Sequence, residues 1–199
     1  MTLTTMMAMT IGAGLTVQAG QISKQRLTVY VLNSANVSDD VIVQAENLAS
    51  SMFGSIGVQV DWRRGEPGSS SGQALAIQLA ANTPKDEMPG ALAYAKPHEG
   101  VHVVVFWDRM QFGPAPARLL AHVMVHEITH ILEGVCRHSE TGIMKARWTD
   151  EDRRAMLIQP LRFAPVDVDL ILRGLAARDS NSALELTANR TVVTAAPKQ

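Results

Sequence analysis

The feature that most constrains this chain is the segment His126-Glu127-Ile128-Thr129-His130, which has the pattern H-E-x-x-H and lies inside a long apolar run. If the run is helical, the two histidines are four residues apart and their rings leave the same face about one turn apart. Two imidazoles so placed can bind one metal ion, and the glutamate between them is placed to accept a proton from a water at that metal. The motif therefore predicts a metal site with a general base beside it.

The residues around the motif predict a helix over residues 116–133. Pro114 and Pro116 suit the first turn of a helix, and Gly134 is typical of a helix end. The helix is apolar nearly all round, which predicts that it is buried, and buried histidines need a partner that offsets their lost hydration. A metal ion is one such partner. The alternative is a pair of core histidines hydrogen-bonded to backbone carbonyls.

The helix is followed by Gly134, His138 and Gly142-Ile143-Met144. Together with the motif, these residues resemble the metzincin clan of zinc peptidases. In that clan the helix ends at a glycine, a third histidine follows, and a methionine lies in a turn beneath the metal. The matching residues here are Gly134, His138 and the Met144 of Gly142-Ile143-Met144. The resemblance implies a Zn²⁺ site with three histidine ligands, His126, His130 and His138. It also implies that Met144 forms the apolar floor of that site.

The spacing in this chain departs from the metzincin pattern. Metzincins read H-E-x-x-H-x-x-G-x-x-H, whereas this chain has Glu133 and Cys136 where the pattern has the glycine and the third histidine. We interpret the difference as a turn lengthened by two residues, which makes His138 the third ligand. An alignment without a gap makes Cys136 the ligand instead, and a thiolate binds zinc well.

Two further side chains compete for the metal in the sequence. His122 lies four residues before His126 and so falls on the same helical face, where it could line the cleft or support a ligand. Glu151 lies on the next predicted helix, in the kind of place where gluzincin peptidases keep a glutamate ligand.

The remaining segments predict an α+β fold. Alternating or β-branched runs predict strands, and apolar residues at helical spacing predict helices. The expected strands cover residues 26–32, 58–62, 75–79, 90–95 (at the sheet edge) and 101–107 (in mid-sheet), and the other expected helices cover 39–53, 150–160 and 165–178. This order is similar to a metzincin: a twisted mixed sheet of about five strands backed by helices, then the active-site helix, the Met-turn and a C-terminal helix.

The ends of the chain differ from its middle. Residues 1–19 hold an apolar stretch followed by Val17-Gln18-Ala19, which is the small-x-small pattern of a signal peptide, although the first basic residue is Lys24. We therefore expect a secreted or periplasmic protein with a catalytic domain over residues 20–178. The polar residues 179–199 predict a disordered tail.

The composition excludes several classes of partner. The net charge is −1, only 5% of the 199 residues are aromatic, and the sequence has no basic cluster that could bind a phosphate backbone. We therefore expect no nucleic-acid partner. No run reaches the ~20 apolar residues of a membrane-spanning helix, so we expect no stable membrane insertion. The single cysteine excludes an internal disulfide. No feature of the sequence predicts an oligomeric state.

The expected activity is that of a zinc-dependent endopeptidase acting on polypeptides, with a zinc-bound water and Glu127 as general base. Metzincins often add a tyrosine that stabilises the oxyanion, and this chain has no tyrosine after Met144. One alternative is a non-catalytic zinc-binding module on the same fold, although a purely structural site gains nothing from a buried, unligated glutamate. The other is a gluzincin-type peptidase with Glu151 as third ligand.

Overall fold

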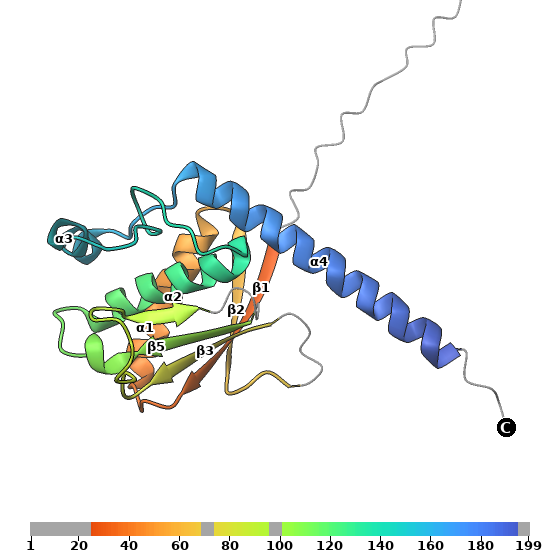
Figure 1. The fold of residues 1–199 in the computed structure, drawn as a ribbon, viewed down its shortest axis with the longest axis horizontal. Coiled ribbons are helices and arrows are strands. Elements are labelled where there is room, and N and C mark those ends of the chain that lie inside the picture. Colours follow the sequence, from red (N-terminus) through yellow and green to blue (C-terminus); the bar gives the residue numbers. More distant parts are fainter. Residues whose placement is uncertain (1–24, 69–73, 96–100, 195–199) are drawn as a thin grey trace, which may run out of the picture.

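A computed structural model describes residues 25–68, 74–95 and 101–194 of the chain (Figure 1). The elements before the motif are β1 (Gln25–Asn33), α1 (Asp39–Gly54), β2 (Val58–Arg64), β3 (Leu75–Ala80), β4 (Ala93–Ala95), β5 (His102–Phe106) and a 3-10 helix η1 (Trp107–Arg109). They are followed by α2 (Pro116–Glu133), α3 (Asp150–Ile158) and α4 (Pro165–Thr194). The α+β architecture with a five-stranded mixed sheet agrees with the sequence-based prediction.

The sheet has the strand order β2-β1-β3-β5-β4. The first four of these strands are parallel to one another, and β4 pairs antiparallel with β5 at the edge. The predicted edge position of β4 is confirmed, although this strand is shorter than the predicted 90–95. The strand β5 lies inside the sheet, as its continuous apolar run predicted.

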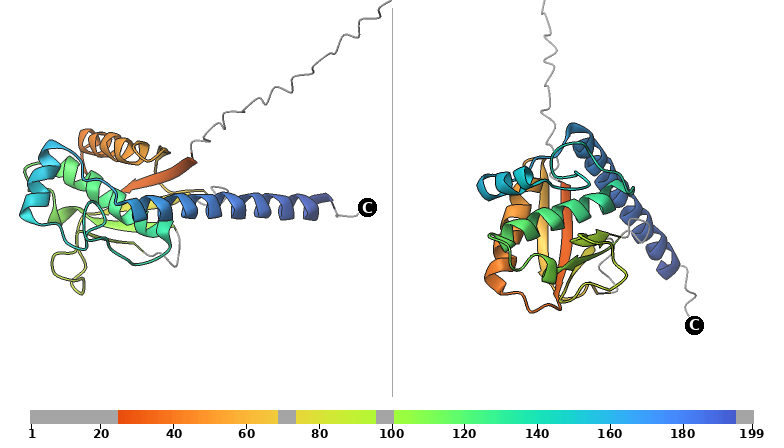
Figure 2. Two further views of the ribbon diagram at one scale, coloured as in Figure 1. Left: turned by 90° about the horizontal axis from the view of Figure 1, so that it is seen from above. Right: turned by 60° about the vertical axis from the view of Figure 1, so that its left-hand side comes forward.

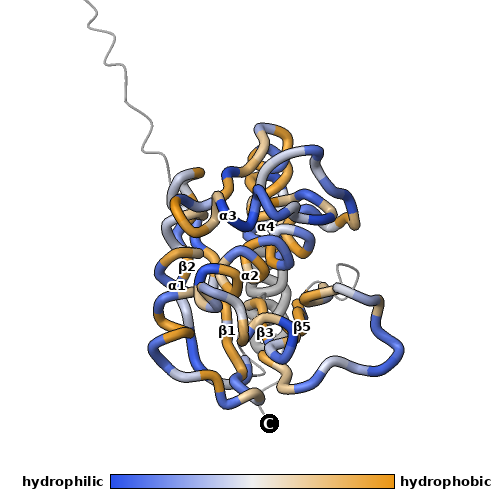
Figure 3. The backbone as a smooth tube through the Cα atoms, turned by 90° about the vertical axis from the view of Figure 1, so that its left-hand side faces the viewer, coloured by the Kyte–Doolittle hydropathy of each residue, from blue (hydrophilic) through white to orange (hydrophobic). Residues whose placement is uncertain are grey.

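One face of the sheet carries the core. Buried residues alternate along the strands, as a half-covered sheet requires, and they include Leu27, Val29 and Val31 on β1 and Leu75, Ile77 and Leu79 on β3. The helices α1 and α2 pack against each other and against this face, α1 over β2 and α2 over β4 and β5 (Figure 2). Hydrophobic segments accordingly gather where α2 meets the strands, and the outer loops are hydrophilic (Figure 3).

The helix α2 has the predicted bounds, and its ends explain why. Pro116 stands in its first turn, where a missing backbone N–H costs nothing. Gly134 follows with φ 68°, a left-handed conformation that favours glycine, and its N–H donates to the carbonyl of His130. The helix is buried along almost its whole length, from Leu120 to Leu132.

The C-terminal part of the fold corrects one prediction. The helix α4 continues to Thr194 rather than ending near Arg178, so residues 179–194 are helical and not a disordered tail. Figure 1 shows this second half of α4 extending away from the body of the molecule. The apolar segment at residues 1–19, interpreted as a signal peptide, lies outside the described residues. Among the described residues, no helix combines the length and apolar character needed to cross a bilayer.

Candidate metal centre

Three imidazoles meet beside the C-terminal half of α2. His126 and His130 come from successive turns of that helix, and their Nε2 atoms lie 3.1 Å apart. His138 comes from the loop after α2, and its ring centroid lies 5.4 Å from that of His126 and 5.0 Å from that of His130. One ligand atom from each of the three lies within 4.8 Å of the others. The structure thus brings together the three histidines that the resemblance selected.

The three histidines are held in their neutral form. Burial lowers the pKa of His126 to about 4, against the effect of its bond to the Ile143 carbonyl. Burial and the two neighbouring imidazoles lower the pKa of His130 to about 4. Burial, followed by the charge of Arg137, also lowers the pKa of His138. Three neutral imidazoles converging on one point are the donor set of many zinc sites, so these residues fit a Zn²⁺ ion.

The ring of His126 is oriented by the turn that contains Met144. The Nδ1 atom of His126 lies 2.8 Å from the carbonyl oxygen of Ile143, so Nδ1 carries the proton and Nε2 keeps its lone pair for a metal. The indole Nε1 of Trp148 donates to the same carbonyl at 3.2 Å. The Trp148 ring also meets the His126 ring edge-on, with centroids 5.6 Å apart. A backbone carbonyl and an indole therefore fix the first ligand.

Glu127 lies on the side of α2 that faces the edge strand. Its side chain is nearly buried, and this burial raises its pKa to about 8, against a hydrogen bond from the backbone of Ala95 that lowers it. Ala95 is the last residue of β4. The carboxyl group that the motif predicts as general base is therefore held between the metal-binding helix and the edge of the sheet.

The loop that carries His138 is closed by backbone hydrogen bonds. The N–H of Ser139 donates to the carbonyl of Met144 at 2.7 Å, and the N–H of Ile143 donates to the carbonyl of Arg162 at 2.9 Å. Gly142 has φ 76°, and a Cβ there would lie 2.1 Å from the Arg162 oxygen, so the turn requires glycine. Met144 is fully buried in the core. The lengthened turn thus folds into a compact loop.

The competing ligands lie apart from the three histidines. His122 is fully buried, and its Nδ1 lies 2.6 Å from the Arg118 carbonyl oxygen. Its Nε2 accepts a hydrogen bond from the Leu161 N–H at 3.1 Å, so both ring nitrogens already have hydrogen-bond partners. Cys136 is exposed and free. Glu151 is exposed in the first turn of α3. Among the described residues, the single cluster with metal-binding geometry contains none of them.

Sequence reasoning missed the residues that support the ligands. The Ile143 carbonyl acts through the backbone, which no side-chain pattern reports. Asp167 bonds Arg137 and Ser139, the two chain neighbours of His138, although it lies at residue separations of 30 and 28. An acidic residue in the first turn of a helix is a common feature of helix starts, so the sequence could have indicated the place of Asp167 in α4. Its contacts with the loop could not be predicted in this way.

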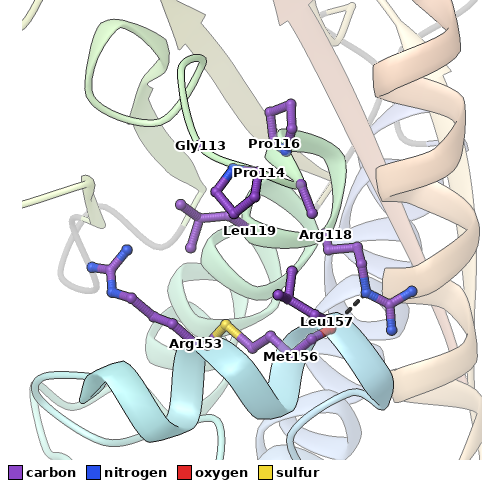
Figure 4. Close-up of a pocket in the computed structure, with 9 residues that line it drawn as sticks. Gly113, Pro114, Pro116, Arg118, Leu119, Arg153, Met156 and Leu157 are labelled. Atoms are coloured by element: carbon purple, nitrogen blue, oxygen red, sulfur yellow. Dashed lines mark hydrogen bonds between the residues drawn. The ribbon is translucent and has the colours of Figure 1, made fainter.

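A small apolar cavity of about 90 Å³ lies between the first turn of α2, the loop before it, and α3 (Figure 4). Leu119 and Met156 line its inside, and Arg153 stands at its rim. None of the three clustered histidines and no atom of Glu127 lines it. This cavity is therefore separate from the candidate metal centre.

Comparison with known proteins gives a fold but no close relative. No family model matches this chain, and no curated protein matches its sequence. Among solved structures, the archaemetzincin from Methanopyrus kandleri superposes with a TM-score of 0.53 at 15% identity, covering 80% of this chain and 99% of that one. The metalloproteinase-II from Bacteroides fragilis superposes with a TM-score of 0.51 at 10% identity, covering 76% of this chain and 54% of that one, so this chain spans about half of it. The chain has a metzincin-like fold.

Proposed function

Starting from this metzincin-like fold, we propose that the chain is a zinc-dependent endopeptidase whose metal is held by His126, His130 and His138. The observation that carries the proposal is the convergence of the three ligand atoms to within 4.8 Å, with Glu127 beside the first ligand. The names of the two similar structures, an archaemetzincin and a metalloproteinase, support it at the level of the fold.

The residues of the chain divide the chemistry between them. Bound zinc would polarise the substrate carbonyl, make a water more acidic and favour the ionised form of the neighbouring Glu127. The Glu127 carboxylate takes the proton of the attacking water and passes it to the leaving amine. The N–H of Ala95 holds this carboxylate from the side of β4. Burial of His126, His130 and Glu127 lowers the local dielectric constant and strengthens these interactions.

The proposed substrate is an extended polypeptide. The strand β4 lies at the edge of the sheet and is paired on one side only, with β5. Its last residue contacts the proposed general base through the Ala95 backbone. A peptide that added to the free side of β4 as a further strand would therefore pass close to Glu127.

A non-catalytic zinc-binding module is the second candidate. Both tyrosines, Tyr30 and Tyr94, precede α2, so the chain has no tyrosine after the metal loop to stabilise an oxyanion. The buried position of Glu127 favours catalysis over this alternative, because a structural site would gain nothing from an unligated buried carboxyl group.

The deciding experiment compares wild-type protein with Glu127→Gln. We expect one zinc per chain in both, measured by mass spectrometry of the acid digest. We expect the wild type to hydrolyse an unstructured polypeptide, and we expect the rate of hydrolysis by the variant to be at least about 100-fold lower. Zinc binding without hydrolysis by the wild type on a broad panel of polypeptides would favour the binding module. A wild type without zinc would contradict both.

We also propose that the protein is exported, on the strength of the apolar segment and small-x-small pattern in residues 1–19. Expression of the full chain in a bacterial host, followed by mass measurement of the protein in the periplasm and medium, tests this. A mature chain that begins at Gly20 is the expected product, and an uncleaved chain found with the cytosolic proteins would contradict it.

A further inference from the structure

The third histidine of the candidate metal centre lacks the support that the other two have. His126 and His130 are buried on α2, whose hydrogen-bonded turns fix their backbone. His138 is exposed and lies on a loop outside the helices and strands. A metal ligand must nevertheless be held within a fraction of an ångström of its binding position. The loop therefore needs an anchor.

Asp167 contacts the residues on both sides of His138. One carboxylate oxygen, Oδ1, accepts a hydrogen bond from Ser139 Oγ at 2.6 Å and another from the Arg137 guanidinium at 2.8 Å. The second oxygen, Oδ2, accepts the backbone N–H of Ala164 at 3.0 Å, at the start of α4. Asp167 is fully buried, so these bonds compensate a carboxylate that has lost its water.

The anchor is itself fixed relative to α2. Arg137 also bonds Glu133, the last residue of α2, at 3.2 Å, and the Glu133 side chain is fully buried. Further along α4, the backbone of Gly174 lies against α2, since a Cβ there would lie 1.8 Å from the Leu132 carbonyl oxygen. The position of Asp167 is thus tied to the helix that carries the other two ligands.

A network of two buried carboxylates and one arginine is a poor way to stabilise a fold, because desolvation offsets most of the charge attraction. Its placement suggests another role. We propose that Asp167 is a positioning residue for the third metal ligand, acting by holding Arg137 and Ser139 so that the His138 imidazole meets those of His126 and His130. This inference rests on the zinc site proposed above.

The test is a double-mutant cycle on zinc affinity. The zinc dissociation constant is measured by competition with a chelating dye for the wild type, Asp167→Asn, His138→Ala and the double variant. We expect Asp167→Asn to weaken zinc binding about tenfold or more. In the His138→Ala background the same substitution should have no further effect, because the ligand that it positions is gone. With Co²⁺ in place of zinc, the visible absorption of Asp167→Asn should shift towards that of His138→Ala.

The matched control is Asp152→Asn. Asp152 is the third residue of α3 as Asp167 is of α4, and its carboxylate likewise accepts a backbone N–H at a helix start, that of Thr149 at 2.7 Å. Both substitutions should lower the melting temperature of the metal-free protein. Zinc affinity should stay within about twofold of wild type for the control. The described side-chain bonds of Asp152 reach Lys145 and Thr149, near the α3 end of that loop, and not His138 or its two chain neighbours.

Several outcomes would overturn the inference. Unchanged zinc affinity in Asp167→Asn would do so while leaving the zinc peptidase proposal intact. An equal loss in the His138→Ala background would also do so, because it would indicate a through-space charge effect on the whole site. If Asp167→Asn does not fold, Ser139→Ala decides: it removes one bond of the anchor, and unchanged zinc affinity would contradict positioning. A wild type that binds no zinc would overturn this inference and the proposed function together.

Discussion

The Nδ1 atom of His126 and the carbonyl oxygen of Ile143 lie 2.8 Å apart, across 17 residues of chain. This contact joins the first proposed ligand to the turn that contains Met144. It fixes both the direction of the ring and the nitrogen that remains free for a metal. The Ile143 carbonyl also accepts the Trp148 indole N–H, so one backbone oxygen serves two side chains.

We predict that Trp148→Phe lowers stability without emptying the metal site. The substitution keeps an aromatic ring but removes the N–H that donates to the Ile143 carbonyl, whose bond to His126 remains. The free energy of unfolding should fall by about 1 kcal/mol, measured by urea denaturation of the metal-free protein. Zinc content should stay at one per chain, and its loss would show that the indole does more than support the turn.

We predict that Glu133→Gln stabilises the metal-free protein above pH 6. Burial raises the pKa of Glu133 to about 6, against the opposing charge of Arg137. A carboxyl group whose pKa is raised by folding contributes stability below its unfolded value of 4.5 and loses it as the pH rises through 6. Glutamine cannot ionise and is not subject to this loss. The free energy of unfolding of the variant, relative to that of the wild type, should therefore rise by about 1–2 kcal/mol between pH 4.5 and pH 7.5.

Urea denaturation at four or five pH values with a chelator present measures this difference. A constant offset between the two proteins across the range would contradict the assignment to Glu133. So would a loss of stability in the variant that grows with pH, because the Glu133–Arg137 ion pair would then outweigh the cost of burial.

We predict that Gly174→Ala disrupts the packing of α4 on α2. The added Cβ would lie 1.8 Å from the backbone oxygen of Leu132, a contact that only movement of a helix can relieve. The loss of stability should be at least about 3 kcal/mol. The matched control is Gly54→Ala at the end of α1, where an added Cβ meets nothing within 4 Å and stability should hold or rise. Equal melting temperatures for both variants would contradict the close crossing.

We predict that Cys136→Ser keeps one zinc per chain with wild-type affinity. The cysteine is exposed and lies outside the cluster of three histidines, so its thiol is not needed for the site. His138→Ala, two residues away, should weaken zinc binding sharply. The two variants are compared by chelator competition. Weaker binding in the serine variant together with intact binding in the alanine variant would restore the alignment without a gap and make Cys136 the third ligand.

The part of the site that the sequence predicts is the part built from local periodicity. The helix α2 and its two histidines follow from a four-residue spacing inside an apolar run, and Gly134 marks the end. The resemblance added His138, whose loop has no periodic signal of its own. The helical residues 179–194 were not predicted, because their sequence is polar and lacks the apolar spacing that predicts helices.

The supporting contacts were beyond prediction for a different reason. A carbonyl is present at every residue, so nothing in the sequence singles out that of Ile143 as the partner of His126. The bonds of Asp167 to the loop of His138 depend on how α4 crosses α2, which is set by tertiary packing and not by neighbours in sequence.

The three proposed ligands all lie between residues 126 and 138, whereas Asp167 lies on α4, the second helix after α2. A chain emerging from the ribosome therefore exposes all three imidazoles before it exposes Asp167. Loop closure between the ligands is entropically cheap at so short a separation. The order of synthesis thus allows metal capture to come first and the anchoring of its third ligand to follow, once α4 has been made.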